Sequence, residues 1–265
     1  METVCSSHKQ KSLGDVLDRR GDLLNRLVEE PTNKRELVER LDCSRSTVDR
    51  SVRELESYDL VAYDEGQYRA TTFGRLAAAE YRRFERRLTT IHRLKPALEW
   101  LPVEEFDLDL GCLADATVVV STPEDPYAPA NYHADAVAES DRFRGLLPAV
   151  GLNQMETATE AVGDGQRQTL VVEREVAEKL REKPHYAEKV EELLASGDVG
   201  LFVYDGPIPY FLGIYDEVVH VGVEDDDGIP RALVESDAPE LREWAESTYA
   251  DYRRTAREFD RVRSA

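Results

Sequence analysis

The sequence predicts a small helical domain closed by a β-hairpin, then a long linker helix, then an α/β domain with a mixed sheet. Three observations predict this order. Three short helical patterns followed by two β-prone runs come first, a heptad-like apolar stripe comes next, and β-branched runs alternating with helical patterns fill the remainder. We expect the parts to occupy residues 1–75, 76–107 and 108–265.

Three helices are expected in the first part. Apolar residues recur at helical spacing over residues 13–28, and Pro31 ends that helix. Asn33, with a Glu three residues later, has the form of a capping box at the start of a short second helix. Ser44 is a good N-cap for a third helix of about residues 45–58.

The third helix has one apolar face and one polar, basic face. Val48, Val52 and Leu55 fall on one stripe, and short polar residues and arginines project from the opposite side. A face of this kind fits the major groove of double-stranded DNA, where arginine reaches guanine edges or phosphates and Ser/Thr add smaller contacts. The predicted DNA contacts of this helix are Arg45, Ser46, Thr47, Arg50 and Arg53.

A β-hairpin follows the third helix. Two β-prone runs, residues 60–63 and 67–71, flank an acidic turn that contains Gly66. Acidic residues at the tip would repel phosphate, so Arg69 is the predicted DNA contact of the hairpin.

Three helices followed by a hairpin is the winged-helix order. Residues 34–41, residues 44–48 and the following Leu60-Val61 resemble archaeal winged-helix transcription regulators of the broad ArsR/MarR type. The resemblance covers about residues 13–75 and implies DNA binding. A winged helix that makes only protein contacts is the alternative.

The linker helix carries an apolar seam with 4-3-4-3 spacing. This seam predicts a coiled-coil-like contact with a second copy of the chain, although a helix packed on its own domain needs a similar stripe. Pro96 and Pro102 are expected to break the chain, which places a domain boundary near residues 95–112. The predicted dimerisation residues are Tyr81, Phe84, Leu88 and Ile91.

The last part reads as an α/β domain. Residues 117–121 are the expected first strand, and residues 170–172 and 200–204 repeat the type, with helical patterns between them. This alternation favours a largely parallel sheet. Further on, three β-prone runs with short connections indicate antiparallel hairpins, and a helix of about residues 239–262 closes the domain.

This region resembles the effector domain of the archaeal methanogenesis-regulator family. The resemblance is carried by residues 113–119, 144–148 and 205–210 and by the terminal Glu243-Trp244-Ala245. It implies a regulatory domain that responds to a ligand or dimerises, with a fold similar to phospholipase-D-like sugar-sensing regulators. The HxK motif that catalyses phosphodiester transfer in that wider group is absent from the sequence.

The sequence gives little support for catalysis. The five histidines are scattered, and neither a Walker loop nor a GxSxG motif occurs, so no catalytic residue, metal site or cofactor is predicted. The loop after the strand at residues 200–204 lies where open α/β sheets place ligands. There Asp205 would accept hydrogen bonds from ligand hydroxyls and Tyr210 would stack on a ligand; a Pro-rigidified turn is the alternative.

Charge divides the chain unevenly. The net charge is -20, but residues 1–95 hold 19 basic and 17 acidic residues, whereas residues 96–265 hold 15 and 37. Of the 34 basic residues only 7 are lysines, which suggests a halophilic cytoplasm, in which acidic surfaces stay soluble when salt screens repulsion. The negative total therefore does not exclude DNA.

Together these features predict a dimeric, cytoplasmic transcription regulator without enzymatic activity. Its expected partners are double-stranded DNA, a second copy of the chain and a small-molecule effector. No apolar run reaches the roughly 18 residues of a membrane span, so no membrane partner is expected. The alternatives are an enzyme for small phosphorylated or sugar-like molecules, or a protein–protein adaptor, whose winged helix does not bind DNA.

Overall fold

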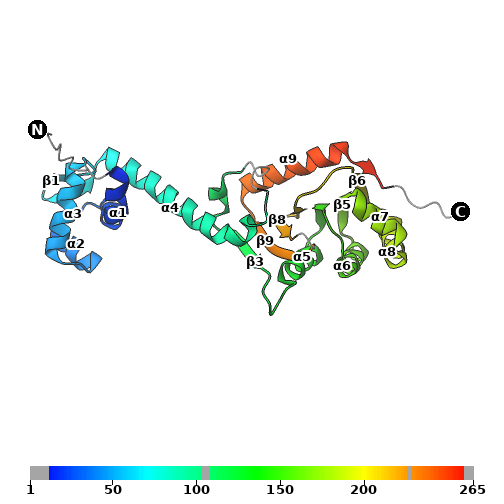
Figure 1. Cartoon of the computed structure of the whole chain (residues 1–265). Helices are drawn as coiled ribbons and strands as arrows, with labels where there is room; N and C mark the ends of the chain where they lie inside the picture. Colours follow the sequence, from blue (N-terminus) through cyan, green and yellow to red (C-terminus); the bar gives the residue numbers. More distant parts are fainter. Residues whose placement is uncertain (1–11, 103–107, 226–227, 260–265) are drawn as a thin grey trace, which may run out of the picture. The chain divides into compact units, whose positions relative to one another are not determined.

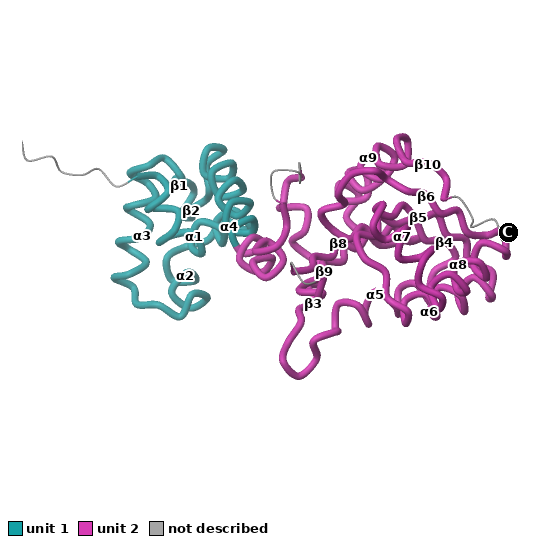
Figure 2. The backbone as a smooth tube through the Cα atoms, turned by 45° about the vertical axis from the view of Figure 1, so that its right-hand side comes forward, with its two compact units in different colours: residues 1–88 teal, residues 89–265 magenta. Residues whose placement is uncertain are grey.

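The computed structural model describes residues 12–102, 108–225 and 228–259. The chain divides into two units, Met1–Leu88 and Thr89–Ala265 (Figure 2). The long helix α4 (Thr72–Leu98) contributes residues to both units. None of the described helices is long and apolar enough to cross a membrane.

The first unit begins with the expected three helices, which are α1 (Leu13–Glu29), α2 (Lys34–Leu41) and α3 (Arg45–Ser57). Two of the expected caps are confirmed. The Asn33 side chain accepts the backbone N–H of Glu36, and the Ser44 side chain accepts that of Thr47. Each cap satisfies a donor that the first helical turn leaves without an intrahelical partner.

The expected hairpin is also confirmed. It consists of β1 (Val61–Asp64) and β2 (Gln67–Ala70), joined by Glu65 and Gly66 with φ angles of 50° and 87°. Two positive φ angles are typical of the type I′ turn, whose twist matches that of the strands. Thr32 and Tyr68 exchange backbone hydrogen bonds of 3.0 and 2.8 Å, so the segment before α2 pairs with the hairpin.

Close packing fixes the hairpin against the start of α4. The apolar faces of α1, α2 and α3 share one core with Leu60, Ala70 and Ala78. A Cβ atom at Gly74 would lie 1.9 Å from the carbonyl oxygen of Leu60. Because no side chain fits in that space, glycine permits this approach of two backbones.

The expected break at Pro96 is wrong. Pro96 lies inside α4, close to its end at Leu98. A proline there removes one backbone hydrogen bond, and the burial of Leu94 and Ala97 in the core of the second unit offsets that loss.

The described residues of the second unit form a 3-10 turn, eight strands and the helices between them. In chain order these are η2 (Leu110–Leu113), β3 (Thr117–Val120), α5 (Ala128–Glu139), β4 (Arg142–Leu147), α6 (Leu152–Gly163), β5 (Arg167–Glu173), α7 (Arg174–Glu182), α8 (Pro184–Ser196), β6 (Val199–Tyr204), β7 (Phe211–Ile214), β8 (Val219–Glu224), β9 (Pro230–Ser236), α9 (Pro239–Thr255) and β10 (Arg257–Glu258).

The strands form one mixed sheet in the order β10-β6-β5-β4-β7-β8-β9-β3. Strands β4, β5 and β6 are parallel, and the remaining pairs are antiparallel. The mixed sheet is confirmed, but β3 is not its first parallel strand, because it pairs antiparallel with β9 at the edge. The sequence reading also missed β4 and extended the last helix, which ends at Thr255 and not at residue 262.

Helices cover both faces of this sheet (Figure 1). Helix α9, the end of α4 and η2 pack on one face, around Leu146, Val171 and Leu212. Helices α5 to α8 pack on the other face, around Phe143, Leu170 and Leu201. The second unit therefore has two apolar cores, one on each side of the sheet.

Candidate nucleic-acid interface

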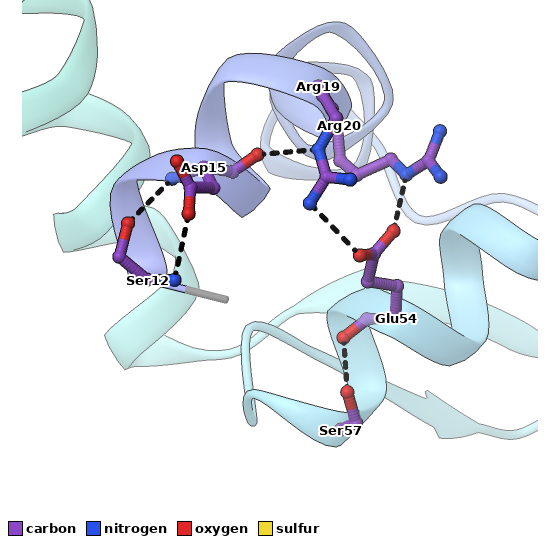
Figure 3. Close-up of polar contacts among 6 residues, drawn as sticks. All are labelled: Ser12, Asp15, Arg19, Arg20, Glu54 and Ser57. Atoms are coloured by element: carbon purple, nitrogen blue, oxygen red, sulfur yellow. Dashed lines mark hydrogen bonds and ion pairs between the residues drawn. The ribbon is translucent and has the colours of Figure 1, made fainter. Parts of the chain in front are cut away.

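Helix α3 is held against α1 by ionic and apolar contacts. The Glu54 carboxylate accepts hydrogen bonds from Arg20 Nε at 2.8 Å and from an Arg19 terminal nitrogen at 3.3 Å (Figure 3). The Ser57 hydroxyl donates to the Glu54 carbonyl at 2.7 Å and closes the end of the helix. The apolar stripe of α3 is fully buried in the core of the first unit. These contacts fix which face of α3 is turned outward.

The outward face carries arginines that have no ionic partner among the described residues. Arg45, Arg50 and Arg53 are exposed, and none forms a salt bridge with a residue in the described part of the chain. The half-buried Asp49 pairs instead with Lys34 of α2 at 2.8 Å. The hydrogen bond from Lys34 holds the pKa of Asp49 below its usual value, with smaller contributions from Lys34, Arg45 and Arg53 as charges. The Asp49 carboxylate beside these arginines is thus held by a lysine.

Hydroxyl groups gather at the N-terminus of α3. The Ser44 Oγ atom lies 2.9 Å from Ser46 Oγ and 2.8 Å from Thr47 Oγ1. Ser46 is exposed and Thr47 is half-buried. The predicted contacts Ser46 and Thr47 therefore lie beside Arg45 and Arg50 on the first turns of one helix, where the dipole favours negative charge.

The predicted wing contact is exposed but paired. Arg69 lies on β2 and forms an ion pair with Asp64 across the hairpin. A phosphate would have to replace that carboxylate. Tyr63, which the sequence reading did not select, is 59% exposed on the same hairpin, with its ring centroid 4.8 Å from that of Tyr68. The sequence feature that could have indicated Tyr63 is an aromatic residue at an outward position of a short strand.

The predicted dimerisation residues differ in their surroundings. Tyr81 is half-buried against the core of the first unit, and its hydroxyl donates to Asp18 Oδ1 at 3.1 Å. Burial, then the hydrogen bond to Asp18, raises the pKa of Tyr81. Phe84, Leu88 and Ile91 are exposed by 53%, 51% and 43%. Tyr81 thus has a role within its own unit, and the other three side chains leave an apolar stripe on α4 uncovered.

The two predicted ligand contacts lie in different environments. Asp205 is exposed and pairs with Arg174 at 2.8 Å and with Arg257 at 3.6 Å. Tyr210 is buried in the core beneath α9, where its ring centroid lies 5.9 Å from that of Trp244. Neither lines the larger cavity of the second unit, which lies on the opposite face of the sheet from this core.

Comparison with protein families identifies both units. The model of the methanogenesis regulatory protein FilR1 middle domain matches residues 126–255, and the model of the HVO_A0261 N-terminal domain matches residues 14–93. The chain joins an HVO_A0261-type N-terminal domain to a FilR1 middle domain. The resemblance of the second region to the methanogenesis-regulator family is therefore confirmed. No curated protein matched the chain.

Solved structures show distant likenesses to this chain. The archaeal chromatin protein TrmBL2, whose structure shows a novel mode of DNA binding, is 15% identical over 97% of this chain and 96% of its own, with a TM-score of 0.43. The phospholipase D family member Nuc from Salmonella typhimurium is 16% identical over 54% of this chain and 98% of its own, with a TM-score of 0.44. Phosphatidylserine synthase from Haemophilus influenzae Rd KW20 is 11% identical over 54% of this chain and 39% of its own, with a TM-score of 0.39.

Proposed function

We propose that this protein is a transcription regulator that binds double-stranded DNA through α3 and the β-hairpin, under the control of its second unit. One observation carries the proposal. The exposed polar face of α3 presents Arg45, Arg50 and Arg53, and no carboxylate in the described ranges pairs with them. Arginines without internal partners on an outward helix face suit phosphate and guanine recognition.

The family of the second unit supports a regulatory role. The FilR1 domain takes its name from a methanogenesis regulatory protein. A regulatory domain joined to a DNA-binding domain provides two sites whose occupancies are linked, because a ligand that favours one arrangement of the chain changes its affinity for DNA. We therefore assign DNA binding to the first unit and the control of that binding to the second.

A dimer is the state that we propose on DNA. Phe84 and Leu88 are large apolar side chains on successive turns of α4, and both are more than half exposed. A second α4 helix would cover them. Two copies related by a two-fold axis would place their α3 helices in half-sites about 34 Å apart on one face of the DNA. The double variant Phe84→Asp/Leu88→Asp should therefore be a monomer in sedimentation-velocity experiments.

Selection from randomised duplex DNA tests the proposal. We expect the wild-type chain to enrich a palindromic sequence, with an affinity that falls as salt rises because bound phosphates release counterions. The double variant Arg50→Ala/Arg53→Ala should enrich nothing. Arg254→Ala is the matched control, since Arg254 is an exposed arginine of α9 that pairs with Asp251. A folded wild-type chain that enriches no sequence at any salt concentration would refute DNA recognition.

A further inference from the structure

A cavity lies in the apolar core between the sheet and helices α5, α6 and α8. The cavity has a volume of about 100 Å³. Aliphatic and aromatic side chains make up most of its wall. Its polar side chains are His133, Gln154, Gln168 and Glu224, and no lysine or arginine of the described ranges lines it. A cavity of this kind suits a molecule that is largely apolar and uncharged.

Gln168 of β5 supplies an acceptor in the cavity wall. Gln166 Nε2 donates to the carbonyl oxygens of Val137 and Ser140, at 2.5 and 2.7 Å, which fixes the Gln166 amide with its oxygen facing Gln168. The Gln168 Nε2 group then donates to that oxygen at 2.7 Å. Its own Oε1 atom is buried and has no hydrogen-bond partner in the described structure. A buried acceptor without a donor costs free energy that a bound hydroxyl would recover.

His133 of α5 supplies a donor. Burial, and next the neighbouring His220, lowers the pKa of His133 to about 3, so the ring is neutral at pH 7. Its Nδ1 atom lies 2.5 Å from the Tyr215 hydroxyl, for which the described residues provide no other hydrogen-bond partner. We assign the single ring proton to Nε2, so that the Tyr215 hydroxyl donates to Nδ1 and Nε2 is a donor. Within the described structure Nε2 has no hydrogen bond of its own.

The donor and the acceptor are both adjacent to Phe143. Gln168 is the register partner of Phe143 in the parallel pair of β5 and β4. The His133 ring centroid lies 5.6 Å from that of the same Phe143. His133 and Gln168 therefore both lie next to Phe143 in the wall of one cavity.

We infer that this cavity binds a neutral, largely apolar molecule that carries a hydroxyl group, with the hydroxyl between His133 Nε2 and Gln168 Oε1. Resting on the proposed function, this occupant is the effector of the regulator. An anionic head group is disfavoured, since the wall offers no cation to neutralise it and contains the Glu224 carboxyl. The site lies away from the predicted Asp205 and Tyr210.

Three small probes with the same propylbenzene scaffold test the inference on the full chain. These are 4-propylphenol, propylbenzene and 4-propylbenzoate, which present a hydroxyl, no polar group and a carboxylate on the same scaffold. In calorimetric titrations at pH 7 we expect the phenol to bind about tenfold more tightly than the hydrocarbon, because it satisfies the unpaired groups. The benzoate should bind most weakly.

Variants locate the site. Ala158→Phe on α6 fills the cavity and should abolish binding of both neutral probes. Ala250→Phe, at an exposed position of α9, is the matched control and should leave binding unchanged. Gln168→Met removes the acceptor and should bring the phenol within about twofold of the hydrocarbon. If Ala158→Phe does not fold, a change in the His133 ring signals of the wild type on addition of the phenol locates the probe by NMR.

The outcomes separate this inference from the proposed function. A folded wild-type chain that binds neither neutral probe, or that binds the benzoate best, overturns the inference. Phenol binding that persists in folded Ala158→Phe, or that leaves the His133 signals unmoved, also overturns it. DNA binding is measured on the same preparation. A chain that binds DNA but not the phenol refutes only the cavity assignment, and one that binds the phenol but no DNA refutes only the proposed function.

Discussion

The arginines on the outward face of α3 differ from several arginines of the second unit. In the second unit Arg144 pairs with Glu246, Arg174 with Asp205 and Arg231 with Asp225. On the outward face of α3, Arg45, Arg50 and Arg53 have no such partner among the described residues. An arginine held by a carboxylate stabilises its own unit, whereas one without a partner is available to an external anion. The difference separates arginines that are available to an external anion from arginines that stabilise their own unit.

Charge balance follows the same division. Residues 1–95 hold nearly equal numbers of basic and acidic residues, 19 and 17, whereas acidic residues exceed basic ones by 37 to 15 in residues 96–265. The second stretch would repel DNA at low salt, and the first would not. The net charge of -20 is therefore unevenly distributed, and residues 1–95 can approach phosphate. Substitutions in each unit test this difference.

The largest effect is expected from the α3 arginines. Arg50→Ala should weaken binding to the selected DNA by about 1–3 kcal/mol if Arg50 contacts a base, and Arg53→Ala by a similar amount. Arg254→Ala in the second unit should change the affinity by less than about 0.5 kcal/mol. Fluorescence anisotropy titrations at matched salt measure all three. Equal losses for Arg50→Ala and Arg254→Ala would show that the absence of internal partners has no functional meaning.

Packing of the first unit can be changed without touching α3. Gly74→Ala should lower the free energy of unfolding by about 1–3 kcal/mol or more, because the new Cβ collides with the Leu60 carbonyl. Gly21→Ala is the matched control. No atom lies within 4 Å of its added Cβ, and alanine favours the helix, so a gain of about 0.5–1 kcal/mol is expected. Denaturant unfolding measures both, and a neutral Gly74→Ala would contradict the tight contact.

A buried histidine should make the second unit sensitive to acid. The folded-state pKa of His133, about 3, lies below the ordinary value of 6.5, so its stabilisation is present above pH 6.5 and is lost as the pH falls toward 3. At pH 5 the unfolded chain binds a proton that the native chain does not. The wild type should therefore lose about 2 kcal/mol more than His133→Gln between pH 7.5 and pH 5. Parallel pH profiles in the two proteins would place His133 in solvent.

Glu224 should act in the opposite direction and more weakly. Burial, then Asp225 and Glu173, raises the pKa of Glu224 to about 7, so its contribution to stability is present below pH 4.5 and is lost as the pH rises through 7. Glu224→Gln should therefore stabilise the protein by about 1 kcal/mol at pH 8, less than the full shift implies because the carboxyl is partly solvated. At pH 4 it should have no effect. Stabilisation of equal size at both pH values would contradict the raised pKa.

The elements of the first unit could be predicted from the sequence because they depend on local interactions. The caps at Asn33 and Ser44, the turn at Glu65-Gly66 and the apolar stripe of α3 each depend on residues close in the chain. The outward arginines could be predicted for the same reason, because helical periodicity fixes the face that they share. The lack of carboxylate partners for these arginines could not be predicted, because it depends on the contact between Lys34 and Asp49.

The features that the sequence reading missed depend on distant contacts. The burial of Leu94 and Ala97 carries α4 through Pro96, and pairing with β9 places β3 at the edge of the sheet. Strand β4 contains Arg142, Arg144 and Gly145, which lowered its β-like character although it lies within the sheet. The cavity is formed by side chains from many elements, so no single segment indicates it.

Genome-wide DNA occupancy in the native host, at its own intracellular salt, tests the central claim most directly. The tagged wild-type chain and the Arg50→Ala/Arg53→Ala variant would be compared at equal abundance. We expect discrete, palindromic sites for the wild type and their loss in the variant. Featureless occupancy of the wild type, or sites that persist unchanged in the variant, would contradict the assignment of DNA recognition to Arg50 and Arg53 of α3.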